Sequence, residues 1–237
     1  MTKYEFVYAD IETYSPNKDP QFWYAGLKTS GKDDFRWYDN FKDYWKDLIE
    51  PIKGKTKVVV FHNSKYDISI LQYHAVRELG YTMNPYQRGQ TKAIYTAQTT
   101  EIYDTSNLKC TFVVDSRPLM PGKLANWGAL MNFPKGDLDV AYEWREITKE
   151  DIAYLERDIE ILERAFRDLC EGETHVVNGE LTQSSVTQAE FKKTWADIDT
   201  NRSFKRNGLK RQFSGNSTEK ELLPLPKAVK LEVEWAL

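Results

Sequence analysis

Hydrophobic and polar positions follow two different periods along the chain, which predicts strands alternating with helices. Stretches rich in aromatic and β-branched residues predict the strands, at 4–12, 22–27, 35–38, 57–61, 93–103 and 108–114. We expect the first three strands to form an antiparallel meander and the last two to form a hairpin. The run 57–61 is dominated by apolar residues, as is typical of a strand buried on both faces.

Apolar residues at helical spacing predict the helices, at 41–49, 65–79, 123–131, 148–171 and 186–197. Asn40 is expected to cap the first helix, and Gly80 to end the second. The segment Thr148–Asp151 resembles a capping box, and it opens the strongest helical pattern in the chain. This order of elements predicts an α/β protein, and a change to polar and then basic sequence places a boundary near residue 172.

The composition narrows the class of protein further. The 237 residues include 33 Lys and Arg against 36 Asp and Glu, a formal net charge of −3, which argues against a basic protein that coats nucleic acid. Hydrophobic residues make up 41% of the chain, enough to build a core. A mean hydropathy of −0.65 and the lack of a long apolar run argue against a membrane-spanning helix. Two cysteines are too few for a disulfide scaffold or a cysteine-rich zinc site, so we expect the protein to reside in the reducing cytoplasm.

The first candidate site is the acidic pair Asp10 and Glu12 at the end of the first predicted strand. Residues two apart on a strand point to the same face, about 6.6 Å apart along the strand. Two carboxylates so placed repel each other unless a cation neutralises them. The alternative is a solvated surface pair, and a second Asp-x-Glu occurs at Asp158 and Glu160. The apolar residues before Asp10 favour a position at the edge of the core.

The second candidate site is the turn between the strand 57–61 and the helix that follows. Asp67 falls in the first turn of this helix, where it would face the end of the neighbouring strand. Asn63 or Ser64 can simply cap the helix, and His62 can be a hydrogen-bonded histidine at the edge of the core. With three histidines in the whole chain, we do not expect a histidine-based metal site.

The third candidate site is the pair Tyr154 and Asp158 on the long helix. Positions i and i+4 share one face of a helix, with about 5–6 Å between their Cβ atoms. Alone, such a pair is better explained by a surface tyrosine beside a solvated aspartate. Four carboxylates that converge from three elements would need divalent cations, and oxygen ligands without thiolates select Mg²⁺ or Mn²⁺. The chemistry that suits this arrangement is phosphodiester hydrolysis by two ions about 3.5–4 Å apart.

Taken in this order, the motifs resemble the 3′–5′ exonuclease domain of family B DNA polymerases, of the DEDD type with tyrosine in its last motif. Within that family the chain looks most like the protein-primed polymerases of small tailed phages. The segments that match its three exonuclease motifs are Asp10–Thr13, Phe61–Asp67 and Tyr154–Asp158. Lys135–Asp139 and Asp115–Ser116 match further positions of the protein-primed subgroup. The resemblance implies a ribonuclease-H-like fold, in which helices flank a mixed central sheet.

The resemblance also implies roles for individual residues. Those that would ligate two Mg²⁺ or Mn²⁺ ions are Asp10, Glu12, Asp67 and Asp158. Tyr154 would orient the attacking water, and Lys135 would place a positive charge near the scissile phosphate, although a solvated turn lysine is the alternative for Lys135. The residues that would hold the single-stranded 3′ end are Thr13, His62, Asn63, Tyr66 and Ser116.

The leading hypothesis is a proofreading-type 3′–5′ exonuclease in residues 1–172 that acts on single-stranded DNA ends, with 173–237 as a connector toward a polymerase domain. The chain has no Asp-x-x-Ser-Leu-Tyr-Pro segment, so we expect no polymerisation from it alone. A second hypothesis is the N-terminal part of a split polymerase, working with a separate polymerase subunit in phage or plasmid replication. A third is a catalytically silent domain that binds nucleic acid or a partner protein. The resemblance implies the cytoplasm of a bacterial host and no membrane partner.

Overall fold

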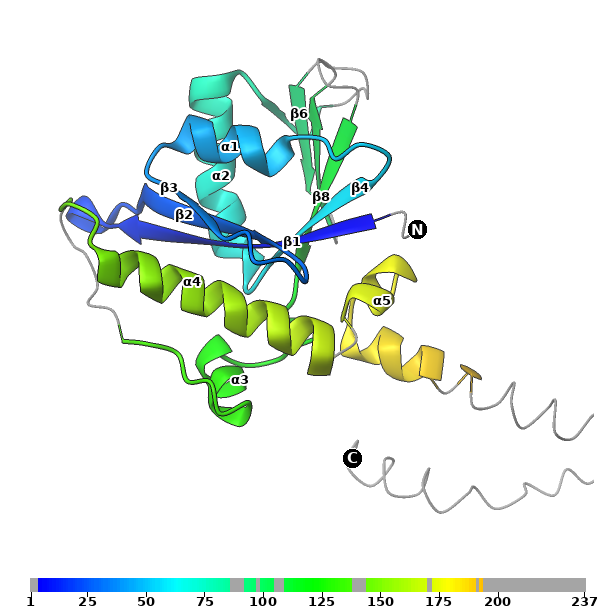
Figure 1. Cartoon of the computed structure of the whole chain (residues 1–237). Helices are drawn as coiled ribbons and strands as arrows, with labels where there is room; N and C mark the ends of the chain where they lie inside the picture. Colours follow the sequence, from blue (N-terminus) through cyan, green and yellow to red (C-terminus); the bar gives the residue numbers. More distant parts are fainter. Residues whose placement is uncertain are drawn as a thin grey trace, which may run out of the picture. The chain divides into compact units, whose positions relative to one another are not determined.

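The computed structural model describes residues 4–85, 92–96, 99–104, 109–137, 144–169, 172–190 and 192–193. These residues form a mixed α/β fold, in which helices flank both faces of one eight-stranded sheet (Figure 1). The architecture confirms the expected α/β class and is consistent with a ribonuclease-H-like fold. None of the described helices is long and apolar enough to cross a membrane.

The sheet has the strand order β3-β2-β1-β4-β8-β7-β6-β5. Its strands are β1 (Tyr4–Tyr14), β2 (Gln21–Thr29), β3 (Arg36–Tyr38), β4 (Thr56–Phe61), β5 (Thr82–Met83), β6 (Lys92–Thr96), β7 (Thr100–Asp104) and β8 (Lys109–Asp115). The central strands β1, β4 and β8 run parallel, and β1, β2 and β3 form the predicted antiparallel meander. The carboxyl ends of the three parallel strands therefore meet at one edge of the sheet.

The helices are α1 (Phe41–Ile49), α2 (Ser64–Leu79), α3 (Leu124–Leu130), α4 (Lys149–Arg164) and α5 (Gly172–Val177), with the 3₁₀ turn η1 (Pro16–Lys18) and the π-helical turn η3 (Ala165–Leu169). Three of the expected helix signals are confirmed. The Asn40 side chain accepts hydrogen bonds at the start of α1, and Thr148 and Asp151 form a complete capping box on α4. Gly80 ends α2 with a φ of 73°, a left-handed conformation that costs glycine little.

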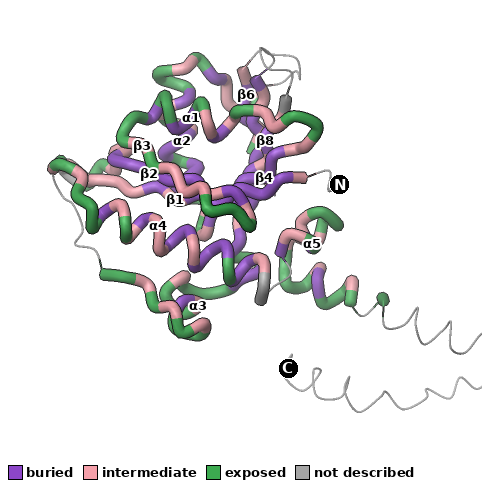
Figure 2. Tube along the Cα trace, viewed as in Figure 1, coloured by how far each residue is buried: buried purple, intermediate pink, exposed green. Residues whose placement is uncertain are grey.

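Each face of the sheet carries its own hydrophobic core. Odd-numbered residues of β1, such as Ala9, pack with α1 and α2, whereas even-numbered residues, such as Tyr8, pack with α4. Buried positions run through the sheet and along the side of α4 that faces it (Figure 2). Because side chains two apart share a face, Asp10 and Glu12 continue the row of Tyr8 and point toward α4.

A glycine brings α4 close to the sheet beside the acidic pair. Gly26 of β2 lies opposite Asp10 of β1 in the antiparallel register. A Cβ atom at Gly26 would lie 2.7 Å from Cδ1 of Ile159 and 3.0 Å from Cδ2 of Leu155, closer than carbon atoms pack. The missing side chain therefore lets α4 approach β1 and β2 at the level of the candidate site.

Three of the predicted elements differ from the structure. The stretch 93–103, expected to be one strand, contains two antiparallel strands, β6 and β7, and β7 pairs in turn with β8. The predicted long helix is α-helical to Arg164 and then widens into η3, whose residues close larger helical turns. The sequence predicts a helix at 186–197. In the structure it begins three residues earlier, and residues 183–190 are helical.

By its internal contacts the chain divides into two units, Met1–Ala189 and Glu190–Leu237. The first unit includes α5, because the carboxylate of Glu173 accepts hydrogen bonds from Tyr8 Oη at 2.7 Å and from Ser30 Oγ at 2.5 Å. The boundary near residue 172 and the connector role of 173–237 remain predictions. The predicted basic segment at 202–211 lies outside the described residues.

Candidate metal centre

Three carboxylates meet between β1 and α4. Asp10, Glu12 and Asp158 each offer one oxygen, and these oxygens lie within 4.8 Å of one another. The alternation of β1 turns the first two side chains toward α4. Leu155 and Ile159, fully buried against the sheet, fix the rotation of α4 that turns Asp158 toward them. The structure thus brings together three of the four predicted metal ligands.

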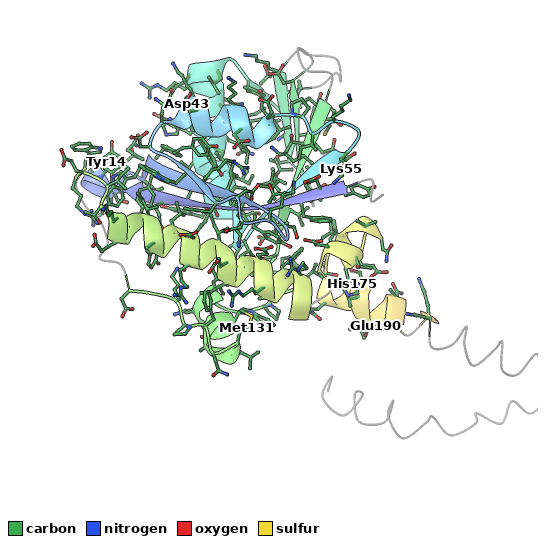
Figure 3. The ribbon with its side chains drawn as sticks, in the orientation of Figure 1. Tyr14, Asp43, Lys55, Met131, His175 and Glu190 are labelled. Carbon is green, nitrogen blue, oxygen red and sulfur yellow. The ribbon has the colours of Figure 1, made fainter. Side chains whose placement is uncertain are left out.

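The other predicted site residues lie near the same part of the sheet, because β4 and β8 end there. Side chains fill the layer between α4 and the sheet, and the labelled residues Tyr14 and Lys55 lie at the two far ends of the sheet (Figure 3). The last paired residues are Tyr8 with Val60 and Phe61 with Asp115, so β4 and β8 end beside the part of β1 that carries Asp10 and Glu12. The start of α2 contributes Tyr66 and Asp67, and Ser116 follows the end of β8.

Asp67, the fourth predicted ligand, approaches from the opposite face of the sheet. It lies in the first turn of α2 and is 4% exposed. Burial and the negative charge of Asp10 raise its pKa well above the ordinary value. Asp67 is therefore close enough to interact electrostatically with Asp10 and Glu12, although its oxygens are not part of the compact group of three.

The carboxylates repel one another strongly in the absence of a metal ion. Burial, together with the charge of Asp158, raises the pKa of Asp10 to about 7. Burial, together with the charges of Asp10 and Asp158, raises the pKa of Glu12 to about 9. Burial also raises the pKa of Asp158, against the lowering effect of Lys135. The repulsion among the three carboxylates falls when a cation neutralises them.

Lys135 and Tyr154 stand at one side of the three carboxylates. The Lys135 ammonium group forms an ion pair with Asp158 and lies 4.8 Å from the centre of the Tyr154 ring. The ion pair shows that Lys135 is not a solvated turn lysine. Burial raises the pKa of Tyr154 to about 12, so its hydroxyl stays protonated near neutral pH.

The turn after β4 has a different construction from the one expected. Asn63 adopts a left-handed φ of 66° and its side chain does not cap α2. Instead the Asn63 side-chain oxygen accepts a hydrogen bond from Arg117 Nη1 at 2.9 Å. The backbone N–H groups of Asn63 and Arg117 both donate to Asp115 Oδ1, each at 2.9 Å. The alternative in which the Asn63 side chain simply caps the helix therefore does not apply, because this side chain is bonded to Arg117 after β8.

His62 and Ser116 hold each other at the same edge. Ser116 is fully buried, and its hydroxyl lies 2.8 Å from His62 Nδ1. His62 Nε2 lies 3.0 Å from the carbonyl oxygen of Gly122, to which it donates. Nδ1 must then accept from the serine hydroxyl, which fixes the neutral tautomer, and burial lowers the pKa of His62 accordingly.

The remaining single-strand candidates, Thr13 and Tyr66, lie on the other side of the carboxylates. Their hydroxyl oxygens are 2.7 Å apart, which joins the segment after Glu12 to the first turn of α2. Tyr66 is 42% exposed, so part of its side chain is open to solvent. The structure thus brings all the predicted binding residues to one edge of the sheet, and their role in binding DNA remains a prediction.

A cavity of about 460 Å³ opens beside Asp10 and Asp158. Its wall contains His62, Asn63 and Lys135, together with two cations that sequence reasoning missed, Arg117 and Lys123. Arg117 directly follows the Asp115–Ser116 pair, and only this position in the sequence could have indicated that it lies at the site. Three cationic side chains thus face the cavity next to the acidic group.

The donor set fits a hard divalent cation. Asp158 Oδ1 is buried and has no hydrogen-bond partner among the described residues. An unpartnered carboxylate oxygen in a buried position carries a large desolvation cost, which a metal ion would offset. Asp10, Glu12 and Asp158 would hold such an ion through oxygen alone, the ligand type that Mg²⁺ and Mn²⁺ prefer.

No protein-family model matches the sequence, and no curated protein matches it either. Among solved structures, phi29 DNA polymerase in complex with primer-template DNA is similar, with a TM-score of 0.65 and 20% identity over 85% of this chain and 36% of that chain. Phi29 DNA polymerase in complex with single-stranded DNA matches with a TM-score of 0.64 and 20% identity over the same shares.

The ternary complex of that polymerase with primer-template DNA and incoming nucleotides also matches, with a TM-score of 0.64 and 19% identity over all of this chain. The matched part makes up 39% of the polymerase chain. The chain therefore spans less than two fifths of the length of the polymerase that it resembles. At this level of identity the likeness establishes a shared fold.

Proposed function

We propose that this chain is a metal-dependent 3′–5′ exonuclease that removes nucleotides from single-stranded DNA ends. The observation that carries the proposal is the convergence of Asp10, Glu12 and Asp158 within 4.8 Å, with buried Asp67 beside them. The pKa values of Asp10 and Glu12 are raised so far that these groups destabilise the metal-free fold, and groups of this kind cluster at functional sites. Similarity to a polymerase that binds single-stranded DNA supports DNA as the substrate.

Two bound Mg²⁺ or Mn²⁺ ions would activate water and stabilise the attacking and leaving oxygens of a phosphodiester. The chain's own residues would position the reaction. Protonated Tyr154 can donate a hydrogen bond to the attacking water, and Lys135 beside it can place positive charge at the phosphate. The cavity walled by Arg117 and Lys123 would accept the negatively charged end of the strand.

Thr13 and Tyr66 would hold the terminal nucleotide from the other side. The hydrogen bond between their hydroxyls would fix the orientation of the Tyr66 ring, and an aromatic ring can stack on any base. His62 and Ser116, which hold each other, would shape the wall of the site. This arrangement suits recognition of a 3′ end without regard to sequence.

A split polymerase is the second candidate function. It is favoured by the likeness of this chain to 36–39% of a polymerase chain that itself binds primer-template DNA. The exonuclease would then proofread for a separate polymerase subunit. Co-purification of a second protein that extends primers would support this candidate.

The test is cleavage of a labelled single-stranded oligonucleotide by the full chain with Mg²⁺ or Mn²⁺, beside the same oligonucleotide with a blocked 3′ end. We expect shortening of the free strand alone, and none after substitution of Asp10→Ala with Glu12→Ala. Asp19→Asn, an exposed acid beyond the end of β1, is the matched control and should leave cleavage unchanged. DNA binding without cleavage in either metal would instead support the catalytically silent alternative.

A further inference from the structure

The exposed face of α2 carries aromatic and basic residues in a row that begins at the candidate metal centre. Apart from Glu78 at the end of the helix, its exposed positions recur at helical spacing and so lie on one side of the helix. We call them the α2 strip; they are Lys65, Tyr66, Ser69, Tyr73, Val76 and Arg77. From first to last residue the strip extends about 18 Å along the helix axis.

The strip starts at the site itself. Tyr66 is bonded through its hydroxyl to Thr13, which directly follows the predicted ligand Glu12. The next residue on the chain is Asp67, the buried acid that approaches the three carboxylates. A strand that leaves the metal centre past Tyr66 therefore reaches α2 without crossing another element.

Tyr73, two helical turns further on, offers a second exposed ring. It is 47% exposed, although tyrosine usually covers its ring against the protein. Arg77 lies over this ring, 5.6 Å from its centre, and donates a hydrogen bond to its hydroxyl. The arginine both restricts the ring to one orientation and adds a positive charge next to it.

The charge of the strip is positive. It contains Lys65 and Arg77 and no acidic residue. Of the two acids of α2, Asp67 is buried at the site, whereas Glu78 is exposed next to Arg77 but lies outside the strip, with Oε1 2.6 Å from His74 Nδ1. Exposed aromatic rings beside cations form the type of surface that binds single-stranded nucleic acid irrespective of sequence.

We propose that the α2 strip binds the part of the single strand that lies upstream of its 3′-terminal nucleotide. Tyr73 stacks on a base and Arg77 contacts the phosphate backbone. The inference rests on the proposed exonuclease function and adds a second region of substrate contact, about 10 Å from Tyr66 along the helix. It predicts that longer strands bind more tightly than dinucleotides.

The test compares a thymidine dinucleotide with a longer oligothymidylate. Binding is followed by fluorescence anisotropy without divalent metal, and cleavage with Mn²⁺ gives KM and kcat. Tyr73→Ala should weaken binding of the long strand about fivefold or more, while Tyr73→Phe, which keeps the ring but loses the hydrogen bond from Arg77, should weaken it less. Arg77→Gln should lower the slope of log affinity against log salt by about 1. The dinucleotide KM and the kcat for both substrates should not change.

Trp37→Ala is the matched control, because Trp37 is 40% exposed on β3 and outside the strip. Equal losses for the two substrates, or an unchanged long-strand affinity in Tyr73→Ala, would overturn the inference and leave this face to another partner. If the wild-type chain cleaves neither substrate, the exonuclease proposal fails. The anisotropy measurement still decides whether the strip binds a single strand.

Discussion

The ammonium group of Lys135 forms an ion pair with the carboxylate of Asp158, whose side chain is fully buried. Lys135 comes from the segment after α3, whereas Asp158 lies in the middle of α4. Their contact places a fixed positive charge beside the three carboxylates before any metal ion binds. It also gives the buried Asp158 a partner, which lowers the cost of burying its charge.

Lys135→Ala is expected to lower kcat by about 10²-fold, because a preorganised charge near the phosphate stabilises the transition state. Manganese affinity should not fall, since the variant removes a positive charge that repels the ion. Single-turnover cleavage and Mn²⁺ titration measure the two effects separately. Lys135→Arg should recover part of the rate, and a variant with wild-type kcat would contradict the assigned role.

The metal-free protein should become less stable as the pH rises from about 4 to 9. Asp10 and Glu12 have folded-state pKa values of about 7 and about 9, above their unfolded values. The folded state therefore binds more protons across this window, and its stability falls as they are lost. Asp10→Asn should raise the free energy of unfolding at pH 8 by about 1–2 kcal/mol in the absence of metal.

Urea unfolding at several pH values, with EDTA present, measures this effect. Asp19→Asn, which is exposed, should show no gain. Mn²⁺ should raise the stability of the wild type and have little effect on Asp10→Asn. Equal stability of the wild type at pH 5 and pH 8 would show that the carboxylates do not repel one another as described.

Gly26→Ala tests how closely α4 must approach the sheet. The added methyl group would meet the side-chain ends of Ile159 and Leu155, so these side chains must move, and α4 must shift away from β1 where they cannot. Such overpacking is expected to cost about 1–3 kcal/mol of stability. It should also reduce cleavage, because Asp158 moves with the helix. Gly54→Ala is the control for activity, since nothing lies within 4 Å of a Cβ there, although its φ of 77° carries a strain of its own.

Arg117→Gln should raise KM for single-stranded DNA about tenfold or more while leaving global stability nearly unchanged. The substitution removes a cation from the cavity and the hydrogen bond to Asn63 Oδ1. Steady-state cleavage measures KM, and thermal unfolding checks the fold. Arg164→Gln removes an arginine that is half-exposed on α4 and serves as the control. Unchanged KM in Arg117→Gln would place the DNA elsewhere.

Local periodicity accounts for the part of the site that could be predicted. The period of two on a strand puts Asp10 and Glu12 on one face, and the helical period puts Tyr154 and Asp158 on another. The apolar positions around Asp158 turn it toward the sheet. The structure confirms the meeting of Asp10, Glu12 and Asp158, because these periods hold wherever strand and helix are regular.

Contacts between distant segments could not be predicted in the same way. The Arg117–Asn63 hydrogen bond joins residues 54 positions apart, and only the parallel pairing of β4 with β8 brings them together. The reversal between β6 and β7 lacks the Gly, Pro, Asn or Asp that marks most turns, so 93–103 appeared to be one strand. The close approach at Gly26 likewise depends on the packing of α4.

The central claim is best tested by cleavage of 5′-labelled single-stranded DNA by Asp158→Asn and by Glu160→Gln. These residues belong to the same Asp-x-Glu on α4, but Asp158 joins the metal centre whereas Glu160 lies 3.6 Å from Lys28 Nζ, away from it. With Mn²⁺, wild type and Glu160→Gln should both shorten the strand one nucleotide at a time from its 3′ end, and Asp158→Asn should leave it intact. Equal cleavage by the two variants would contradict the account.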